Sequence, residues 1–328
     1  MLSFGLPVSI CIAYYYNNQR RELFSFLGVR SSRTYQWNLL TVLRLPFYRL
    51  FFETGEAQKC LNMRAVFCND CYLTEEVPKL VATELLGIQQ LEKLKFRYQQ
   101  MRRCYDFSYE EWQKAFTNEL KPFNGYTDTT AVTIPISNPL FKQSFENKGT
   151  IGLDIPTWFN IQENNPRIFI IAQDPLRNEK WYKDCSDAVI SSPFAQHDAT
   201  HRINGGKMVN LMITKLIEEK YAIYLTDSIK YFIYDHKTTE VELSAYIQIL
   251  KKELDLVNPS LCVCLGNKAK EILDKCEINS NSIFFPHLSG TARGSIIKRF
   301  PILKEKATVE NIANIYATEI VKSLESLK

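Results

Sequence analysis

Carboxylate and imidazole side chains follow short apolar runs at three separate points in the second half of the chain. Asp174 comes after Arg167–Ala172 (RIFIIA), Asp227 after Tyr221–Thr226 (YAIYLT), and His287 after Ser282–Phe285 (SIFF). A carboxylate can position a water molecule or stabilise a cation, and an imidazole can exchange a proton, so together they suit acid–base work on a small group. Each residue alone is more often a turn or helix cap. The placement of such a residue after three separate apolar runs is what predicts a functional site.

The elements that would position these residues alternate between strand-like and helix-like segments. A further apolar run lies at Leu261–Leu265 (LCVCL) and is followed by Gly266. Helical patterns occupy Gly206–Lys220, Thr239–Leu256, Lys268–Cys276 and Val309–Leu327. Strands separated by helices indicate a parallel sheet covered on both faces, with ligands bound beyond the carboxyl ends of the strands. We therefore predict an α/β fold, a three-layer α/β/α sandwich with a four-stranded parallel sheet.

The first part of the chain has a different pattern. Val77–Met101 carries apolar residues at three- and four-residue spacing, which predicts one helix, and Tyr109–Leu120 predicts another, with Ser108 as its N-cap and Glu111 in the capping-box position. Lys121–Asn138 breaks the helical pattern with Pro, Gly, Asn and Thr. We predict a mainly helical accessory region over residues 1–125 and a catalytic domain over residues 126–328.

Composition limits the class of protein. The chain has 328 residues, a net charge of +4 and nine cysteines at irregular spacing, which favours free thiols in a reducing compartment over a disulfide framework. The apolar stretch Leu2–Tyr16 lacks a basic n-region and a cleavage site, and it is shorter than the roughly 20 residues of a membrane helix. These features predict a cytoplasmic protein with no membrane partner. Residues 1–50 hold six arginines against one glutamate, either a surface for phosphates or simply a solvated face.

Several of the segments after the strands resemble uracil-DNA glycosylases. Ala172–Pro175 (AQDP) resembles the G-Q-D-P signature of that superfamily, and Tyr224–Lys230 (YLTDSIK) is similar to the T-N-x-x-K segment of bacterial members. His287–Ser289 (HLS) resembles the H-P-S loop, and the longer run to Arg293 (HLSGTAR) resembles the M-P-S-S-S-A-R loop of thymine-specific relatives. Ser192–Phe194 resembles the segment that supplies a base-stacking Phe. The resemblance covers about residues 160–325.

The resemblance implies a DNA glycosylase that rotates a base out of the duplex and hydrolyses its bond to the sugar. Asp174 would position the water and stabilise the sugar cation, and His287 would donate a hydrogen bond to O2 of the departing base. The other site residues implied are Gln173, Leu176, Phe194 and Asp227 for the base, and Ser289, Thr291, Arg293 and Lys230 for the DNA. Arg293 is either a wedge in the vacated stack or a plain phosphate contact.

Two departures from the family bear on the substrate. Leu176 stands where uracil enzymes carry a Tyr that excludes C5 substituents, so the pocket could admit such a group unless another side chain fills the gap. Asp227 replaces the Asn that reads the edge of uracil. An ionised carboxylate only accepts hydrogen bonds, which favours the N4 amine of cytosine, although Asp227 could instead cap a turn. Together these changes predict a C5-modified cytosine, such as the glucosylated hydroxymethylcytosine of phage DNA, and hence an antiviral role.

No cofactor and no metal are expected for this mechanism. Lys230 is the nearest lysine to the site, but it lies in a segment that is structural in relatives, which favours a monofunctional enzyme. Tyr231 occupies the place of a cluster-binding cysteine in some bacterial relatives, which argues against an iron–sulfur cluster. Cys68 and Cys71 have the spacing of zinc ligands, with Cys60 and Cys104 as possible partners, but no second C-x-x-C exists and buried thiols are the alternative.

Three rival functions can be compared with this prediction. The first is a uracil-DNA glycosylase of base-excision repair, and the second is an inactive lesion-binding protein of the same fold, which should lack Asp174 or His287. The third, a nucleotide-binding α/β protein, should carry a Gly-rich loop after the first strand, and Ala172–Asn178 (AQDPLRN) contains no glycine. The expected partner is double-stranded DNA, with phage DNA as one source, bound by a monomeric chain.

Overall fold

The structure is a computed structural model whose described residues all belong to one compact unit, Leu61–Lys328. The described ranges are 71–106, 133–175, 187–197 and 201–327, apart from residues 147, 150, 163, 203 and 279. The predicted helix Tyr109–Leu120 with its cap Ser108, the stretch Leu2–Tyr16 and the arginines of residues 1–50 lie outside these ranges. So do Leu176, Cys60, Cys68 and the side chain of Cys104.

A five-stranded mixed sheet forms the centre of this unit, with the strand order β3-β6-β4-β8-β9. Its strands are β3 (Thr157–Phe159), β4 (Arg167–Ala172), β6 (Ala222–Asp227), β8 (Leu261–Leu265) and β9 (Ser282–Phe285). β4 pairs in parallel with β6 and β8, and β8 with β9, whereas β3 runs antiparallel to β6. The prediction of a four-stranded parallel sheet is therefore corrected: the edge strand β3 makes the sheet mixed.

A second sheet, absent from the sequence prediction, has four strands in the order β1-β5-β2-β7. They are β1 (Thr133–Ile134), β2 (Ile151–Asp154), β5 (Ala188–Ser191) and β7 (Tyr231–Ile233). β2 and β5 are parallel, and β1 and β7 pair antiparallel with their neighbours. Strands of two to four residues are too short to show the alternation that identifies a strand in a sequence.

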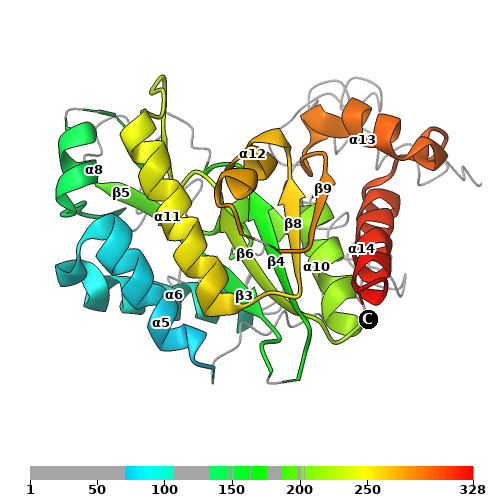
Figure 1. Ribbon diagram of the computed structural model, residues 1–328, viewed down its shortest axis with the longest axis horizontal. Helices are drawn as coiled ribbons and strands as arrows, with labels where there is room; N and C mark the ends of the chain where they lie inside the picture. The colour runs from blue at the N-terminus through cyan, green and yellow to red at the C-terminus, as the bar shows by residue number, and fades with distance from the viewer. Residues whose placement is uncertain are drawn as a thin grey trace, which may run out of the picture. The chain divides into compact units, whose positions relative to one another are not determined.

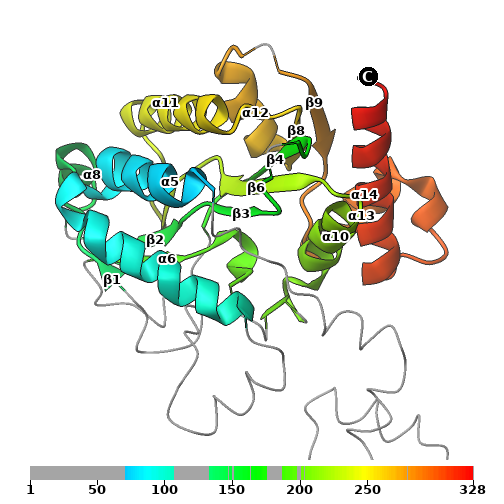
Figure 2. The same cartoon turned by 90° about the horizontal axis from the view of Figure 1, so that it is seen from below.

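Helices cover both faces of the five-stranded sheet (Figures 1 and 2). α11 (Glu240–Val257) and α12 (Asn267–Lys275) lie on one face, and α10 (Lys207–Glu218) and α14 (Val309–Glu325) pack against each other on the other face. The start of α11 is fixed by a capping box, in which Thr239 Oγ1 accepts from the Glu242 N–H and Glu242 Oε2 accepts from the Thr239 N–H. The helix ends at Asn258 in the left-handed conformation.

The predicted helix Val77–Met101 is in fact two helices joined by irregular turns. The chain forms α5 (Leu73–Val81), a π-helical turn at Ala82–Leu86, a 3-10 turn at Ile88–Gln90, and α6 (Leu91–Asp106). The break falls at Gly87, whose φ of +108° lies in the region that favours glycine, and where a Cβ would lie 3.0 Å from the Cβ of Ser137. The long-range contact with Ser137 is invisible to helical periodicity.

α6 is tied to the sheets by polar contacts from buried side chains. Arg97 Nη2 donates to the Ile190 carbonyl at 3.0 Å, and Tyr98 Oη donates to the Pro156 carbonyl at 3.2 Å. Residues 71–106 therefore pack into the same compact unit as the sheets. A domain boundary near residue 125 stays a prediction.

The remaining described elements are short. They are α8 (Pro139–Ser144), η4 (Pro193–Ala195), η5 (Gly290–Ala292), α13 (Arg293–Arg299) and η6 (Pro301–Leu303). Among the helices that the structure describes, none combines the length and the apolar character that a bilayer crossing requires.

Candidate active site

The candidate residues Asp174, Asp227 and His287 all lie at the carboxyl ends of strands in the five-stranded sheet. Asp174 follows β4, Asp227 is the last residue of the neighbouring β6, and His287 follows β9. In the register of β4 with β6, Asp227 pairs with Ala172, two residues before Asp174. The parallel pairing thus places both carboxylates at adjacent strand ends, with His287 two strands from Asp174 and three from Asp227.

His287 and Asp174 interact electrostatically across the sheet edge. Burial lowers the pKa of His287 below its ordinary value, because a half-buried ring is poorly solvated as a cation, and the negative charge of Asp174 raises that pKa in part. The imidazole is therefore neutral at pH 7, the form that donates one ring N–H and can accept a proton at the other nitrogen.

Gly266, at the end of β8, lies between these two strand ends. Its N–H donates to the Phe285 carbonyl at 2.8 Å, and its φ is +101°. A Cβ at this position would lie 3.5 Å from the Cβ of His287, an ordinary contact, so the backbone conformation and not crowding requires glycine. Sequence reasoning noted Gly266 after a strand but assigned it no role. A glycine directly after a buried strand was the available signal.

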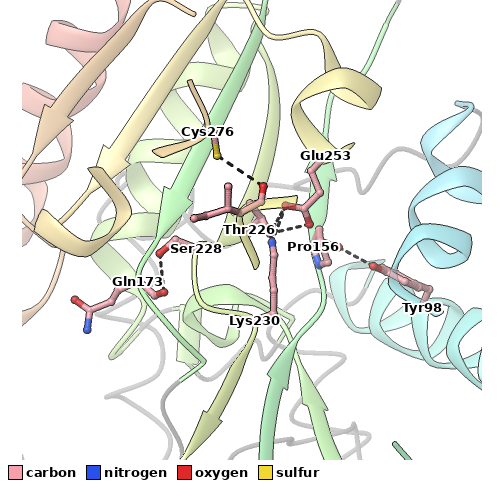
Figure 3. Close-up of polar contacts among 9 residues, drawn as sticks. Tyr98, Pro156, Gln173, Thr226, Ser228, Lys230, Glu253 and Cys276 are labelled. Carbon is pink, nitrogen blue, oxygen red and sulfur yellow. Dashed lines mark hydrogen bonds and ion pairs between the residues drawn. The ribbon is translucent and has the colours of Figure 1, made fainter. Parts of the chain in front are cut away.

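The turn after β4 is held by the turn after β6. Ser228 Oγ donates to the Gln173 carbonyl at 3.0 Å, and the N–H of Ile229 donates to the same carbonyl at 2.9 Å (Figure 3). The exposed side chain of Gln173 donates from Nε2 to Asp174 Oδ2 at 2.8 Å. The Gln173 side chain therefore contacts the Asp174 carboxylate through a hydrogen bond. Ser228 positions the backbone of Gln173, a role that the sequence alone did not indicate.

Phe194 lies against His287. Their ring centroids are 5.3 Å apart and the ring planes differ by 29°, a stacked arrangement between residues 93 positions apart in the chain. Phe194 has φ 55° and Ala195 has φ 46°, so two consecutive non-glycine residues adopt the left-handed conformation. Such strain costs about 1–3 kcal/mol per residue and persists only when the surroundings enforce it.

Buried hydrogen bonds enforce this turn. The Ala195 N–H donates to the Ser192 carbonyl at 2.7 Å, and Ser192 Oγ accepts from the His197 N–H at 3.1 Å. Ser192 Oγ also lies 2.9 Å from His197 Nδ1. Gln196 Nε2 donates to the carbonyl of Gly206 at 3.2 Å, which ties the turn to the start of α10.

Lys230 is placed differently from its predicted role. Its ammonium is 1% exposed and pairs with Glu253 Oε2 of α11 at 2.6 Å (Figure 3). It also donates to Thr226 Oγ1 at 2.8 Å. A buried, paired ammonium is not exposed to a phosphate, so this placement gives no support to the DNA contact predicted for Lys230. Through these two contacts Lys230 links α11 to the end of β6, the strand that carries Asp227.

The other predicted DNA contacts lie on the surface after His287. Ser289 Oγ and Thr291 Oγ1 are 3.0 Å apart, and Thr291 and Arg293 are exposed at the start of the segment that leads into α13. Asp227 is buried, at 2% exposure. Within the described ranges no group of three His, Cys, Asp or Glu side chains could hold a metal ion.

Comparison with known families covers the part of the chain that holds these residues. Residues 159–318 match the model of the uracil DNA glycosylase superfamily. The match runs from the last residue of β3 into α14, so it contains β4 to β9, Asp174, Phe194, Asp227 and His287. The chain therefore carries a uracil DNA glycosylase superfamily domain over these residues. No curated protein matches the chain.

Proposed function

We propose that this protein is a monofunctional DNA glycosylase that removes a flipped pyrimidine base and leaves an abasic site. The placement of Asp174 and a half-buried, neutral His287 at the carboxyl ends of strands in one sheet carries the proposal, because the carboxylate can stabilise a sugar cation and the imidazole can donate a hydrogen bond to the departing base. The superfamily match over residues 159–318 supports action on a base in DNA.

In the proposed reaction the bond between C1′ of the sugar and the base nitrogen breaks, and its electron pair leaves with the base. The carboxylate of Asp174 stabilises the positive charge that develops on the sugar and orients a water molecule toward C1′. The water oxygen forms the new bond to C1′, and the proton that it releases neutralises the departing base anion. His287 donates a hydrogen bond to O2 of the base, where negative charge collects, and a preorganised donor of this kind contributes about 3–4 kcal/mol in model enzymes.

Base entry requires the Phe194–His287 stack to open. A base between two rings needs a contact of about 3.5 Å on each side, or about 7 Å in total, and the two ring centroids are 5.3 Å apart. In the proposal the imidazole therefore moves from the face of Phe194 to the edge of the base, and the base takes its place. Stacking on an aromatic side chain contributes about 1–3 kcal/mol per base.

The proposed substrate is a C5-modified cytosine of phage DNA, which gives the enzyme an antiviral role. Asp227, at 2% exposure, supports it, because in its ionised form the carboxylate only accepts hydrogen bonds and the N4 amine of cytosine is the matching donor. Uracil presents O4 at that position, and a buried mismatch of acceptors discriminates strongly between substrates.

The test uses duplex oligonucleotides with one uracil, cytosine, hydroxymethylcytosine or glucosylated hydroxymethylcytosine, and mass spectrometry of the released base. We expect release of the modified cytosine, no release by Asp174→Ala, and a gain of uracil release in Asp227→Asn. Release of uracil alone by the wild-type protein would support the repair enzyme instead. Tight binding to an abasic site with no release from any substrate would support a lesion-binding protein.

A further inference from the structure

The segment that follows the candidate site is strongly basic and exposed. Between Arg293 and Lys306 the chain has five cationic residues and one anionic residue, Glu305. All five cationic side chains are exposed, and none forms an ion pair within the described residues: Arg293, Lys298, Arg299, Lys304 and Lys306. Some exposed lysines elsewhere, such as Lys207, are paired with carboxylates, whereas others, such as Lys142, have no such pair among the described residues. The segment, which we call the α13 arm (Arg293–Lys306), therefore carries a positive charge that no carboxylate of the described residues neutralises.

The α13 arm is anchored firmly to the domain. Ile296, Phe300 and Leu303 are buried, and the Phe300 ring lies 5.9 Å from Phe285 and 5.6 Å from Tyr316. The arm thus packs on β9 and α14. Backbone hydrogen bonds from the N–H of Leu303 to Phe300 O and from the N–H of Lys304 to Pro301 O close its tip. The arm is a fixed surface and not a loose tail.

The tip of the α13 arm carries an exposed isoleucine. Ile302 is 81% exposed, the highest value of any exposed large hydrophobic residue in the described part of the chain. Leu303, the next residue, and Phe300, two residues before Ile302, are buried at 4% and 9% exposure, whereas Pro301 is exposed. The β-branched side chain is stiff about χ1 and is presented to solvent by a closed turn. A rigid apolar tip flanked by cations fits a contact with a polyanion that also offers an apolar groove.

The arm lies beside the candidate site. It begins six residues after His287 along the chain, and in Figure 1 α13 lies beyond the arrowheads of β8 and β9, at the sheet edge where His287 follows β9. Figures 1 and 2 both place it on the side of β9 and α14, away from α8. Tyr316 also links the two regions, since its hydroxyl donates to the Pro286 carbonyl at 2.9 Å.

We propose that the α13 arm is a second duplex-DNA contact, which grips the phosphate backbone on one side of the flipped base and places Ile302 in the adjacent groove. The inference rests on the proposed action on DNA. Charge complementarity with phosphates and continuity with the site favour duplex DNA as the occupant. The contact is made to backbone and groove shape, so it does not depend on base sequence.

The first experiment measures how duplex binding depends on salt, in an Asp174→Ala background so that the DNA stays intact. Each phosphate contact contributes about 0.9 to the slope of log K against log salt, so Lys298→Gln/Arg299→Gln should lower the slope by about 1.8. The matched control, Lys142→Gln/Lys237→Gln, removes the same charge from exposed positions near α8 and β7 and should leave the slope unchanged. Equal effects of the two double variants would overturn the proposal.

The second experiment tests the tip. Ile302→Ser should weaken duplex binding about tenfold with no change in the salt slope, because it removes apolar contact and no charge. Shortening the duplex on one side of the target base should abolish the difference between Ile302→Ser and the parent, whereas shortening the other side should not.

Vesicles of phosphatidylserine serve as a second polyanionic surface. Loss of vesicle binding but not of duplex binding in Ile302→Ser would overturn the proposal in favour of a membrane surface.

These results are separable from the proposed function. If the wild-type protein releases a base and the arm variants bind duplex as the parent does, the arm proposal fails and the glycosylase stands. If no base is released from any substrate but the arm variants lower the slope as expected, the arm proposal stands and the catalytic proposal fails.

Discussion

Removing the ammonium of Lys230 should destabilise the protein strongly, although the residue lies next to a candidate active site. Lys230 and Glu253 are each 1% exposed, with their charged atoms 2.6 Å apart. Lys230→Met keeps the volume of the side chain but leaves the Glu253 carboxylate buried without its counter-charge. Truncating one partner of a buried ion pair costs about 3–5 kcal/mol. A loss of that size lowers the Tm by roughly 6–20 °C in a domain of this length.

The loss of stability caused by Lys230→Met should depend on pH, because the Glu253 carboxylate can bind a proton and lose its charge. Burial raises the pKa of Glu253, and the Lys230 charge opposes that rise. Without Lys230 the pKa of Glu253 in the folded state rises further above its unfolded value. A raised carboxyl pKa gives stability that is present at low pH and lost as pH rises. The penalty of Lys230→Met should therefore be smaller at pH 5 than at pH 8.

The assay is urea unfolding of wild type, Lys230→Met, Glu253→Leu and the double variant, at pH 5 and pH 8. Replacing both partners should recover most of the loss, since two apolar groups leave no unpaired charge. The matched control is Lys322→Met, which breaks an exposed pair with Glu319 and should cost at most about 0.5 kcal/mol. A cost below 1 kcal/mol for Lys230→Met at pH 8, or no coupling between the two sites, would refute the structural role.

Three further predictions concern the candidate site. The rate of base release should stay constant as the pH is lowered to 6.5 and should decline only below that pH. The reason is that burial lowers the pKa of His287 and the neutral ring is the active form. A rate that already falls above pH 6.5 would contradict this prediction. Gly266→Ala should lose about 1–2 kcal/mol in urea unfolding because its φ is +101°, whereas Gly294→Ala, in helix α13 with open space around it, should be neutral or gain up to about 1 kcal/mol. Ser192→Ala should lower the free energy of unfolding by about 1–3 kcal/mol, because the His197 N–H loses its acceptor. The folded variant should also release the base more slowly, because the strained turn of Phe194 is no longer held. Unchanged base release by the folded variant would show that this turn is not needed.

Local sequence predicted much of the sheet and the residues at its edge. The strands at Arg167–Ala172, Leu261–Leu265 and Ser282–Phe285 have the bounds expected from their apolar runs, and the helix starting at Val309 begins at the expected residue. Runs of β-branched and apolar residues bounded by polar turns contain this information in a few consecutive positions. The order of those runs also indicated which side chains follow the strands.

Tertiary structure decided what those side chains contact. Lys230 was predicted to contact DNA, in a segment that is structural in relatives, and α11 brings Glu253 to it across 23 positions and buries both charges. The break at Gly87, the short strands of the second sheet and the stack of Phe194 on His287 likewise depend on partners far away in the chain. Periodicity reports only the local preference of a segment, whereas burial and the pairing of distant charges arise when helices and strands pack. The sequence alone therefore determined which groups stand at the strand ends, and packing determined which of them face a substrate and which hold the site in place.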